Sequence, residues 1–356
     1  MRHLLLLLYL LLTTAASFSQ NQPPVIDNID INFNAADQMT ITYDLQDAEN
    51  DDAEISLRVS DDNGKTYTIN TSGATGDIGY PVLPGNGKVI QWNYSGQIDM
   101  DGNYKLMLVA DDRQPVDIQA LVDGVDSTRL RNDLEVIEGV RHRTTGATHL
   151  ENVKALIADR FDMYGLEDES VSWDRGGYDA KNIIGTKRGL SDQAEIYIID
   201  GHFDTVDDSP GADDNGSAVA GVLEAARILA PYHFDKTIKF IGFDLEEAGL
   251  VGSNHFVNVD GLKAYETVGG VFNLEMIGYF NNTPNSQTFP FGFEQIYPQV
   301  YDTVRRDSFR GNFITNVGIE THPDLNQAFE DAATQYVPDL KVISLLATER
   351  WLLLTP

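Results

Sequence analysis

The sequence predicts an α/β domain that follows an antiparallel β-sandwich, and two observations support this fold class. From about residue 21 to residue 114, short apolar runs alternate with period two between turns rich in Asp, Asn and Gly, which is typical of antiparallel sheets. After Pro115 the apolar residues recur at helical spacing, and strands then alternate with helices, as in α/β folds. We therefore expect a β-sandwich over residues 21–115 and an α/β domain over residues 116–356.

Composition narrows the class of protein and the kind of site. The 356 residues include 25 Lys and Arg, 55 Asp and Glu, 7 His and no Cys, with a formal net charge of −30. Such a charge repels phosphate backbones and anionic lipids, so we expect neither nucleic acid nor membrane as a partner. A sequence without Cys excludes disulfides, thiolate zinc sites and Cys nucleophiles. Any metal must therefore be bound by His, Asp or Glu.

The first 20 residues differ from the rest of the chain. Arg2 and His3 precede an apolar run over residues 4–12, and small and polar residues follow. This arrangement is typical of a signal peptide, and the apolar run is shorter than the ~20 residues that span a bilayer. We expect residues 1–20 to be removed from an exported protein, secreted or periplasmic. An N-terminal membrane anchor is the alternative.

The N-terminal module resembles the immunoglobulin-like or fibronectin-type accessory domains of secreted enzymes. Its expected strands include residues 39–43, 55–59, 89–92 and 104–109, bounded by turn residues. Residues 60–67 predict a hairpin turn that resembles the Asp-box of many secreted β proteins. This turn and residues 47–52 could also be calcium loops, but neither has the spacing of an EF-hand loop. We expect solvated turns.

Helices and strands alternate in the second domain. Apolar spacing predicts helices over residues 126–138, 148–164, 217–229 and 250–257, with Gly165 as the cap that ends the second of them. Apolar runs predict strands over residues 182–186, 196–199, 238–243 and 268–274.

One His and several carboxylates gather where three of these strands end and one helix begins. They are His202 and Asp204 after the first strand of the three, Glu246 and Glu247 after the second, Glu275 after the third, and Asp214 in the loop before the helix. Ligands of open α/β sheets bind at the carboxyl ends of strands. This donor set suits zinc, manganese or cobalt, and adjacent Glu residues can serve as ligand and general base. Asp204 is spaced to orient the His202 imidazole.

These segments resemble the family-28 metallopeptidases, a family of co-catalytic dizinc aminopeptidases that also includes glutamate carboxypeptidase, glutaminyl cyclases and the non-catalytic transferrin receptor. The resemblance extends from about residue 121 to residue 346. Its motifs are Gly-His-Phe-Asp-Thr-Val at 201–206, Pro-Gly-Ala-Asp-Asp-Asn-Gly-Ser at 210–217, Leu-Glu-Glu-Ala-Gly-Leu-Val-Gly-Ser at 245–253 and Asn-Leu-Glu-Met-Ile-Gly at 273–278. It implies a three-layer α/β/α sandwich with a mixed central sheet, of the zinc-exopeptidase type.

The resemblance also implies two zinc ions and a role for each residue. The implied roles are first-zinc ligands for His202 and Glu275, a bridging ligand for Asp214, a second-zinc ligand for Glu247, the general base toward the metal-bridging water for Glu246, and a catalytic role for Asp204 beside His202. The family usually has Asp at the position of Glu275. Asp213 is expected to order its loop and not to bind metal.

One departure from the family concerns the second zinc. The family supplies a further His from a segment near the C-terminus, whereas no His follows His322 in this sequence, and residues 347–356 do not continue the family's pattern. We expect the C-terminal part of the peptidase domain, with that His, to be missing. His322 precedes Pro323 and is expected at the start of a helix. The stretch between His142 and His149 is similar to one in close relatives, and neither His is assigned a role.

The resemblance implies a secreted zinc-dependent exopeptidase, an aminopeptidase that removes N-terminal residues from peptide substrates. A carboxypeptidase or a glutaminyl cyclase with the same metal ligands is an alternative. A non-catalytic binding ectodomain is another, and an adhesion or glycan-binding role for the β-sandwich is the third.

Overall fold

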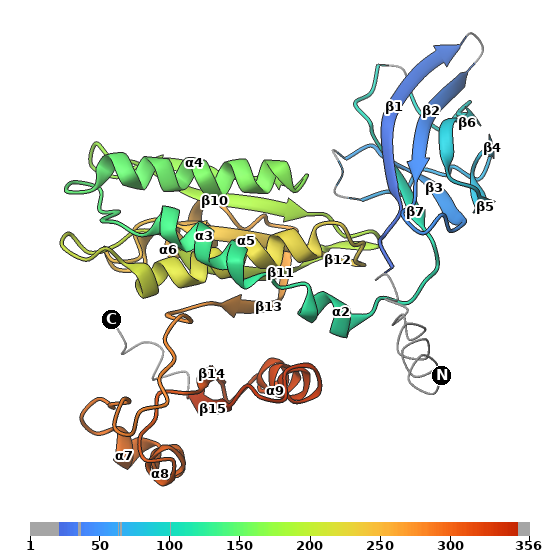
Figure 1. Ribbon diagram of the computed structural model, residues 1–356. Coiled ribbons are helices and arrows are strands. Elements are labelled where there is room, and N and C mark those ends of the chain that lie inside the picture. The colour runs from blue at the N-terminus through green and yellow to red at the C-terminus, as the bar shows by residue number, and fades with distance from the viewer. Residues whose placement is uncertain (1–20, 35–36, 63, 65, 100, 348–356) are drawn as a thin grey trace, which may run out of the picture. The chain divides into compact units, whose positions relative to one another are not determined.

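The computed structural model describes residues 21–347 except 35–36, 63, 65 and 100. The predicted signal peptide at 1–20 and residues 348–356 lie outside the described residues. The chain divides into two compact units, with the boundary between Ala120 and Leu121 (Figure 1). No helix in the described part of the chain has the length and apolar character needed to cross a membrane.

The first unit consists of two antiparallel sheets. One has the strand order β1 (Val25–Asn34), β2 (Gln38–Gln46), β6 (Gly85–Asn93) and β4 (Ala74–Gly76), and the other has the order β5 (Gly79–Val82), β3 (Ala53–Ser60) and β7 (Lys105–Asp111). Alternate side chains of β2 and β3 are buried, and Tyr43 and Trp92 of the first sheet share a core with Ile55 of the second. This alternation confirms the predicted antiparallel sheets.

The two acidic stretches of this unit form turns that their own side chains close. Asp47 accepts hydrogen bonds from the backbone N–H groups of Glu49 and Asp51 through one carboxylate oxygen. Ser60 Oγ accepts from the N–H of Gly64. Such local acceptance by side-chain oxygens is the ordinary chemistry of turns.

The second unit is built on a mixed sheet. Its strands are β8 (Glu167–Asp168), β9 (Val171–Asp174), β10 (Asp179–Lys187), β11 (Asp192–His202), β12 (Lys236–Phe243) and β13 (Thr267–Asn273). The order is β13-β11-β12-β10-β8, with β9 paired to β10. Strand β11 runs parallel to both β12 and β13, whereas β10 is antiparallel to β12. The carboxyl ends of three neighbouring strands therefore lie at one edge.

Apolar side chains cover both faces of this sheet. On one face Ile183 and Phe240 share a core with α3 (Ser127–Ile137), α4 (Ala147–Met163) and α5 (Ala218–Leu229). On the other face Ile184 and Ile241 pack with Phe256, which begins η2 (Phe256–Asp260) directly after α6 (Val251–His255). Figure 1 shows α4 and α5 lying along the sheet.

Two helix boundaries of the second unit are fixed by single residues. Asp126 accepts hydrogen bonds from the first backbone N–H groups of α3, as an N-cap does. Helix α4 ends before Gly165, which has a φ of +71° and donates its N–H to the carbonyl of Asp162. Gly is favoured there because it adopts left-handed backbone at little cost. The predicted cap at Gly165 is confirmed, and the Asp126 cap is seen only in the structure.

The remaining elements of the second unit are short. They are α2 (Ile118–Asp123) at the boundary, η1 (Ala212–Ser217), α7 (Phe293–Ile296), α8 (Pro298–Arg306), β14 (Ile314–Ile319), α9 (Asp324–Tyr336) and β15 (Val342–Ala347). Strands β14 and β15 pair in parallel as a separate two-stranded sheet. His322 stands two residues before α9, as the sequence predicts.

Candidate metal centre

Sheet register brings the predicted site residues to one edge. His202 is the last residue of β11 and lies opposite Phe243, the last residue of β12. Glu246 follows β12 by three residues. On the other side of β11, the N–H of Leu274 donates to the carbonyl of Asp200, which places Glu275 directly beyond β13.

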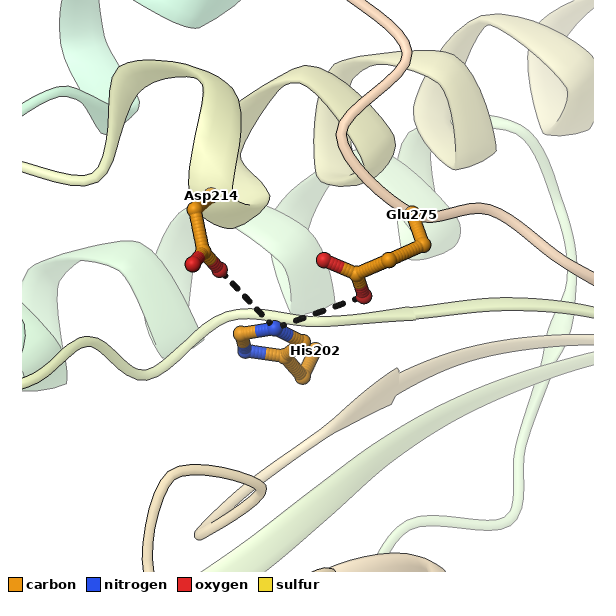
Figure 2. Close-up of side chains that lie close together, drawn as sticks. All are labelled: His202, Asp214 and Glu275. Carbon is orange, nitrogen blue, oxygen red and sulfur yellow. Dashed lines mark ion pairs between the residues drawn. The ribbon is translucent and has the colours of Figure 1, made fainter. Parts of the chain in front are cut away.

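Three side chains form a compact group of ligand atoms. His202 Nε2 lies 3.3 Å from an oxygen of Asp214 and 3.6 Å from an oxygen of Glu275 (Figure 2). The three ligand atoms all lie within 4.8 Å of one another. It is the one such group among the residues that the structure describes. Glu246 also faces it, with a carboxylate oxygen 3.7 Å from the same nitrogen.

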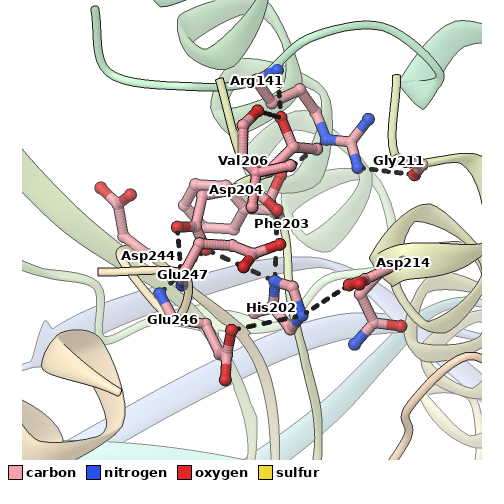
Figure 3. A network of polar contacts seen from close by, with 12 residues as sticks. Arg141, His202, Phe203, Asp204, Val206, Gly211, Asp214, Asp244, Glu246 and Glu247 are labelled. Carbon is pink, nitrogen blue, oxygen red and sulfur yellow. Dashed lines mark hydrogen bonds and ion pairs between the residues drawn. The ribbon is translucent and has the colours of Figure 1, made fainter. Parts of the chain in front are cut away.

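Asp204 joins the imidazole to the pair of glutamates. One Asp204 carboxylate oxygen lies 3.4 Å from His202 Nδ1 and accepts the N–H of Glu246 at 2.9 Å. The other oxygen accepts the N–H of Glu247 at 3.1 Å. Figure 3 draws Asp204 together with His202, Glu246 and Glu247. Nδ1 also lies 3.2 Å from the backbone carbonyl oxygen of Asp204. Because Nδ1 faces both oxygens of Asp204, Nε2 is left toward Asp214 and Glu275, as when a carbonyl or a carboxylate orients the imidazole of a zinc site.

The loop before α5 orders the second carboxylate of the group. Asn215 is fully buried, and its amide nitrogen donates to a carboxylate oxygen of Glu275 at 2.8 Å. The side-chain oxygen Oδ1 of Asn215 accepts the N–H of Met276. Asp213 accepts the hydroxyl of Ser217 and the N–H of Gly278. The loop is thus joined to the segment that follows β13.

Two non-glycine residues adopt left-handed backbone beside the site glutamates. Leu245, directly before Glu246, has a φ of +57°, and Met276, directly after Glu275, has a φ of +48°. This conformation costs about 1–3 kcal/mol for a side-chain-bearing residue, so the surrounding contacts must hold it. Leu245 is 2% exposed, and its burial anchors the turn that aims Glu246 at the group.

Negative charge dominates the electrostatics of the site. Burial opposes protonation of His202, but Asp204 and Glu275 outweigh it and raise the pKa of the imidazole to about 10. Burial raises the pKa of Glu246, and nearby carboxylates add to this effect against the opposing charge of His202. Burial and the charge of Asp214 raise the pKa of Glu247. A cation is the partner that such a cluster lacks.

The observed donor set fits a divalent cation. The separations of 3.3 Å and 3.6 Å between His202 Nε2 and the two carboxylate oxygens exceed the usual length of a good hydrogen bond. They match the ~3.3 Å between two ligands that each lie ~2.0–2.1 Å from a tetrahedral zinc ion. Nitrogen with oxygen ligands is a combination that zinc accepts.

A cavity opens beside the group. It has a volume of about 230 Å³ and is lined by Asp204 and Glu247, together with His142, Arg143 and Asp207. Glu247 therefore faces open space next to the three-ligand group. The carboxylate of Glu247 is not a member of that group.

Three other imidazoles of the described chain are engaged elsewhere. His149 Nε2 lies 3.0 Å from the carbonyl of Ile137, His255 stacks on Trp173, and the Nδ1 atom of His322 contacts the hydroxyl of Thr321. None of them belongs to the three-ligand group.

Two residues that order the site escape the sequence analysis. Asn215 lies inside a recognised motif, but only the fold reveals that it holds Glu275. Arg141 lies 61 positions before His202 in the sequence, yet its guanidinium donates to the carbonyl of Phe203 at 2.6 Å. A basic residue just before the stretch between His142 and His149 is the single sequence signal that could have pointed to it.

Comparison with known proteins gives a family match over the same residues. Residues 182–338 match Peptidase family M28. Aminopeptidase YwaD of Bacillus subtilis is 42% identical over 100 residues, which is 28% of this chain and 22% of that protein. The "Probable lipoprotein aminopeptidase LpqL" of Mycobacterium tuberculosis is 33% identical over 123 residues, 34% of this chain and 23% of that protein. The chain thus matches less than a quarter of either relative's length.

Solved structures also resemble the chain. The crystal structure of LapB from Legionella pneumophila aligns with a TM-score of 0.47 and 20% sequence identity. The alignment covers 64% of this chain and 57% of LapB.

Proposed function

This chain belongs to peptidase family M28 through residues 182–338, and on that basis we propose that it is a zinc-dependent exopeptidase of the aminopeptidase type. The observation that carries the proposal is the convergence of His202, Asp214 and Glu275 on one point, with Glu246 beside them. The similarity to YwaD, which is named as an aminopeptidase, supports the choice of exopeptidase class.

The observed contacts support a proposed set of metal ligands. His202, Asp214 and Glu275 would hold one zinc ion. Asp214 would be shared with a second ion held by Glu247, whose pKa already reflects the charge of Asp214. Zinc in such a site supplies Lewis-acid polarisation of the scissile carbonyl and a lowered pKa for the attacking water.

Glu246 is placed to move the proton that hydrolysis requires. Its carboxylate accepts a proton from the attacking water and passes it to the nitrogen of the leaving amine as the carbon–nitrogen bond breaks. The pKa of Glu246 is raised by burial, which makes its protonated form a weaker acid and its carboxylate a better base near neutral pH. One carboxylate oxygen of Asp204 contacts both the N–H of Glu246 and His202 Nδ1, which holds these two residues relative to each other.

The carboxylates at the mouth of the site favour a substrate with a free amine. Asp207 and Glu247 line the cavity beside the metal ligands, and a protonated N-terminus would reduce their mutual repulsion. The same surroundings disfavour the C-terminal carboxylate that a carboxypeptidase must bind. Arg143 also lines this cavity, and its positive charge is the feature that favours a carboxypeptidase.

A panel of four peptides tests the proposal on the zinc-loaded chain. One peptide has both termini free, one is N-acetylated, one is C-amidated, and one begins with Gln. An aminopeptidase cleaves the free and C-amidated peptides from the N-terminus and leaves the acetylated one intact. Cleavage of the acetylated peptide from its C-terminus would indicate a carboxypeptidase, and loss of ammonia from the Gln peptide a cyclase.

Native mass spectrometry of the zinc-loaded chain counts the bound zinc ions and, together with the peptide panel, distinguishes an enzyme from a non-catalytic binding protein. Two zinc ions with hydrolysis support the full proposal. One zinc ion means that Glu247 does not retain a second ion in this chain. Bound zinc without turnover of any peptide would favour a non-catalytic ectodomain, and a chain that binds no zinc overturns the proposal.

We further propose export of the mature protein, with cleavage near residue 20. The N-terminal pattern of charge and apolar residues supports this proposal. Expression of the full chain in a bacterial host, followed by N-terminal sequencing of protein from medium and periplasm, tests it. A retained residue 1 in the cytoplasmic fraction contradicts it.

A further inference from the structure

We propose that Arg141 is a positioning residue, which fixes the separation between His202 and Asp214 and thereby sets the metal affinity of the site. The inference rests on the proposed function only in requiring that a divalent metal binds at this group. It concerns a side chain that contacts neither metal nor substrate.

Arg141 is fully buried, and its guanidinium donates only to main-chain carbonyls. Its exposed fraction is 0%. The guanidinium makes five hydrogen bonds of 2.6 to 3.0 Å, and the acceptors are the carbonyl oxygens of Phe203, Ile137, Gly139, Pro210 and Gly211. No carboxylate is among these acceptors. A buried guanidinium used in this way joins backbone segments and does not neutralise a neighbour.

Three of the five acceptors lie on the segments that carry His202 and Asp214. Phe203 directly follows His202, and Gly211 lies three residues before Asp214 (Figure 3). The main chain of Arg141 adds two bonds to Thr205, since its N–H donates to the hydroxyl and its carbonyl accepts the backbone N–H. One side chain and its backbone thus connect the end of β11 to the loop before α5.

The contact is close enough to set a distance. Gly211 has a φ of +55°, and a Cβ added there would lie 2.7 Å from an Nη atom of Arg141 and 2.4 Å from the carbonyl of Asp214. The guanidinium therefore approaches the loop backbone as closely as a glycine permits. A shorter or non-planar side chain at position 141 would leave these carbonyls without donors and free the loop to move.

Charge gives a second reason for a guanidinium here. Burial lowers the pKa of Arg141 to about 10, while Asp204 and Asp214 act in the opposite direction. The side chain thus remains a cation at neutral pH, next to an acidic site. Lysine would retain the charge, but it lacks the planar fork that reaches carbonyls in several directions at once.

Zinc affinity of the full chain tests the proposal without any substrate. We would titrate the parent and the variants R141K and R141M against a chromophoric zinc chelator, and record the visible absorption of cobalt(II) at the same site. V153A is the matched control. Val153 lies on the buried face of α4 and is 1% exposed, so its truncation lowers stability without changing a contact of the site.

We expect R141M to bind zinc at least about tenfold more weakly than the parent, in the range found when groups that orient ligands are removed. R141K is expected to fall between the parent and R141M, with a shifted cobalt spectrum. V153A should bind zinc within about twofold of the parent, because loss of core packing changes stability and not ligand geometry.

Parental affinity and a parental cobalt spectrum in R141K and R141M would overturn the proposal, as would equal weakening in V153A. If R141M does not fold, the outcome for R141K decides, because lysine keeps the charge. Hydrolysis by the parent with no effect of Arg141 on zinc affinity refutes the positioning role alone. Weakened zinc binding in variants of a parent that hydrolyses no peptide refutes the peptidase alone.

Discussion

The carboxylate of Asp204 accepts the backbone N–H of Glu246 at 2.9 Å. This bond crosses from the end of β11 to the end of β12, and the same carboxylate faces His202 Nδ1. A proposed metal ligand and the proposed general base are therefore held by one side chain. Asp204 is 4% exposed, so water competes little for its oxygens.

Glu246→Gln removes the proposed general base and keeps its size. We expect kcat for peptide hydrolysis to fall by about 10²- to 10⁴-fold, with no change in the number of zinc ions bound. Steady-state kinetics and native mass spectrometry on one preparation measure both. The control is Glu135→Gln, an exposed position on α3. Activity of the Glu246 variant within tenfold of the parent would remove Glu246 from the mechanism.

Asp204→Asn places an N–H₂ group where two backbone N–H groups and an imidazole nitrogen converge. One amide oxygen cannot serve both Glu246 and Glu247, so the turn after β12 loses an acceptor. We expect zinc affinity to fall about 10- to 100-fold by chelator competition. Asp208→Asn, at an exposed carboxylate four residues further on, should leave the affinity unchanged. Equal affinities in all three proteins contradict this role.

Lys154→Met breaks the buried ion pair between Lys154 and Asp244. Lys154 Nζ lies 3.1 Å from an oxygen of Asp244, and the two side chains are 6% and 0% exposed. The variant strands a buried carboxylate, so we expect a loss of about 3–5 kcal/mol in the free energy of unfolding. Urea unfolding of the metal-free chain measures it. Glu151→Gln removes a partner of Lys154 that is 61% exposed and should cost less than about 1 kcal/mol.

Acid should destabilise the chain through Glu169. Burial alone would raise the pKa of Glu169, but Lys239 and Arg188 outweigh it and lower the pKa to about 2. The folded state thus binds the proton less readily than the unfolded chain, whose Glu pKa is 4.5. This part of the stability, up to about 3 kcal/mol, is present above pH 4.5 and is lost as the pH falls toward 2.

Urea unfolding of the metal-free chain at a series of pH values between 6 and 2.5 checks this expectation. Glu169→Gln should flatten the acid limb of the curve. Glu167→Gln should flatten it less, because Glu167 pairs with the same Arg188 but its side chain is 40% exposed, against 11% for Glu169. An acid limb that is identical in the parent and in Glu169→Gln would show that other carboxylates set the acid sensitivity.

The candidate site residues could be predicted from the sequence because the end of each strand is visible locally, and parallel strands bring their ends together. An apolar run followed by Glu246 and Glu247 can be read in one dimension, and the carboxyl ends of parallel neighbours must lie together. The same logic places His202 and Glu275. The caps of α3 and α4 are equally local, since each depends on one residue type at one boundary.

Other parts of the structure depend on contacts that no local pattern contains. Arg141 donates to five carbonyls on three separate segments. A single Arg between two helices belongs to no periodic pattern, so the sequence does not predict these contacts. The pairing of β14 with β15, apart from the central sheet, is likewise invisible in strand propensity. Tertiary packing decides which strands become neighbours.

Among the residues that the structure describes, β13 pairs with one strand of the central sheet, β11, whereas β11 and β12 each pair with two. A strand paired on one side only separates at a lower free energy than one paired on both sides. His202 therefore ends a strand that is paired on both sides, and Glu275 follows a strand that is paired on one side in the described part of the chain. We expect partial opening of this unit to move Glu275 away from the group before His202 moves. On closing, Glu275 would return to an imidazole that has kept its position.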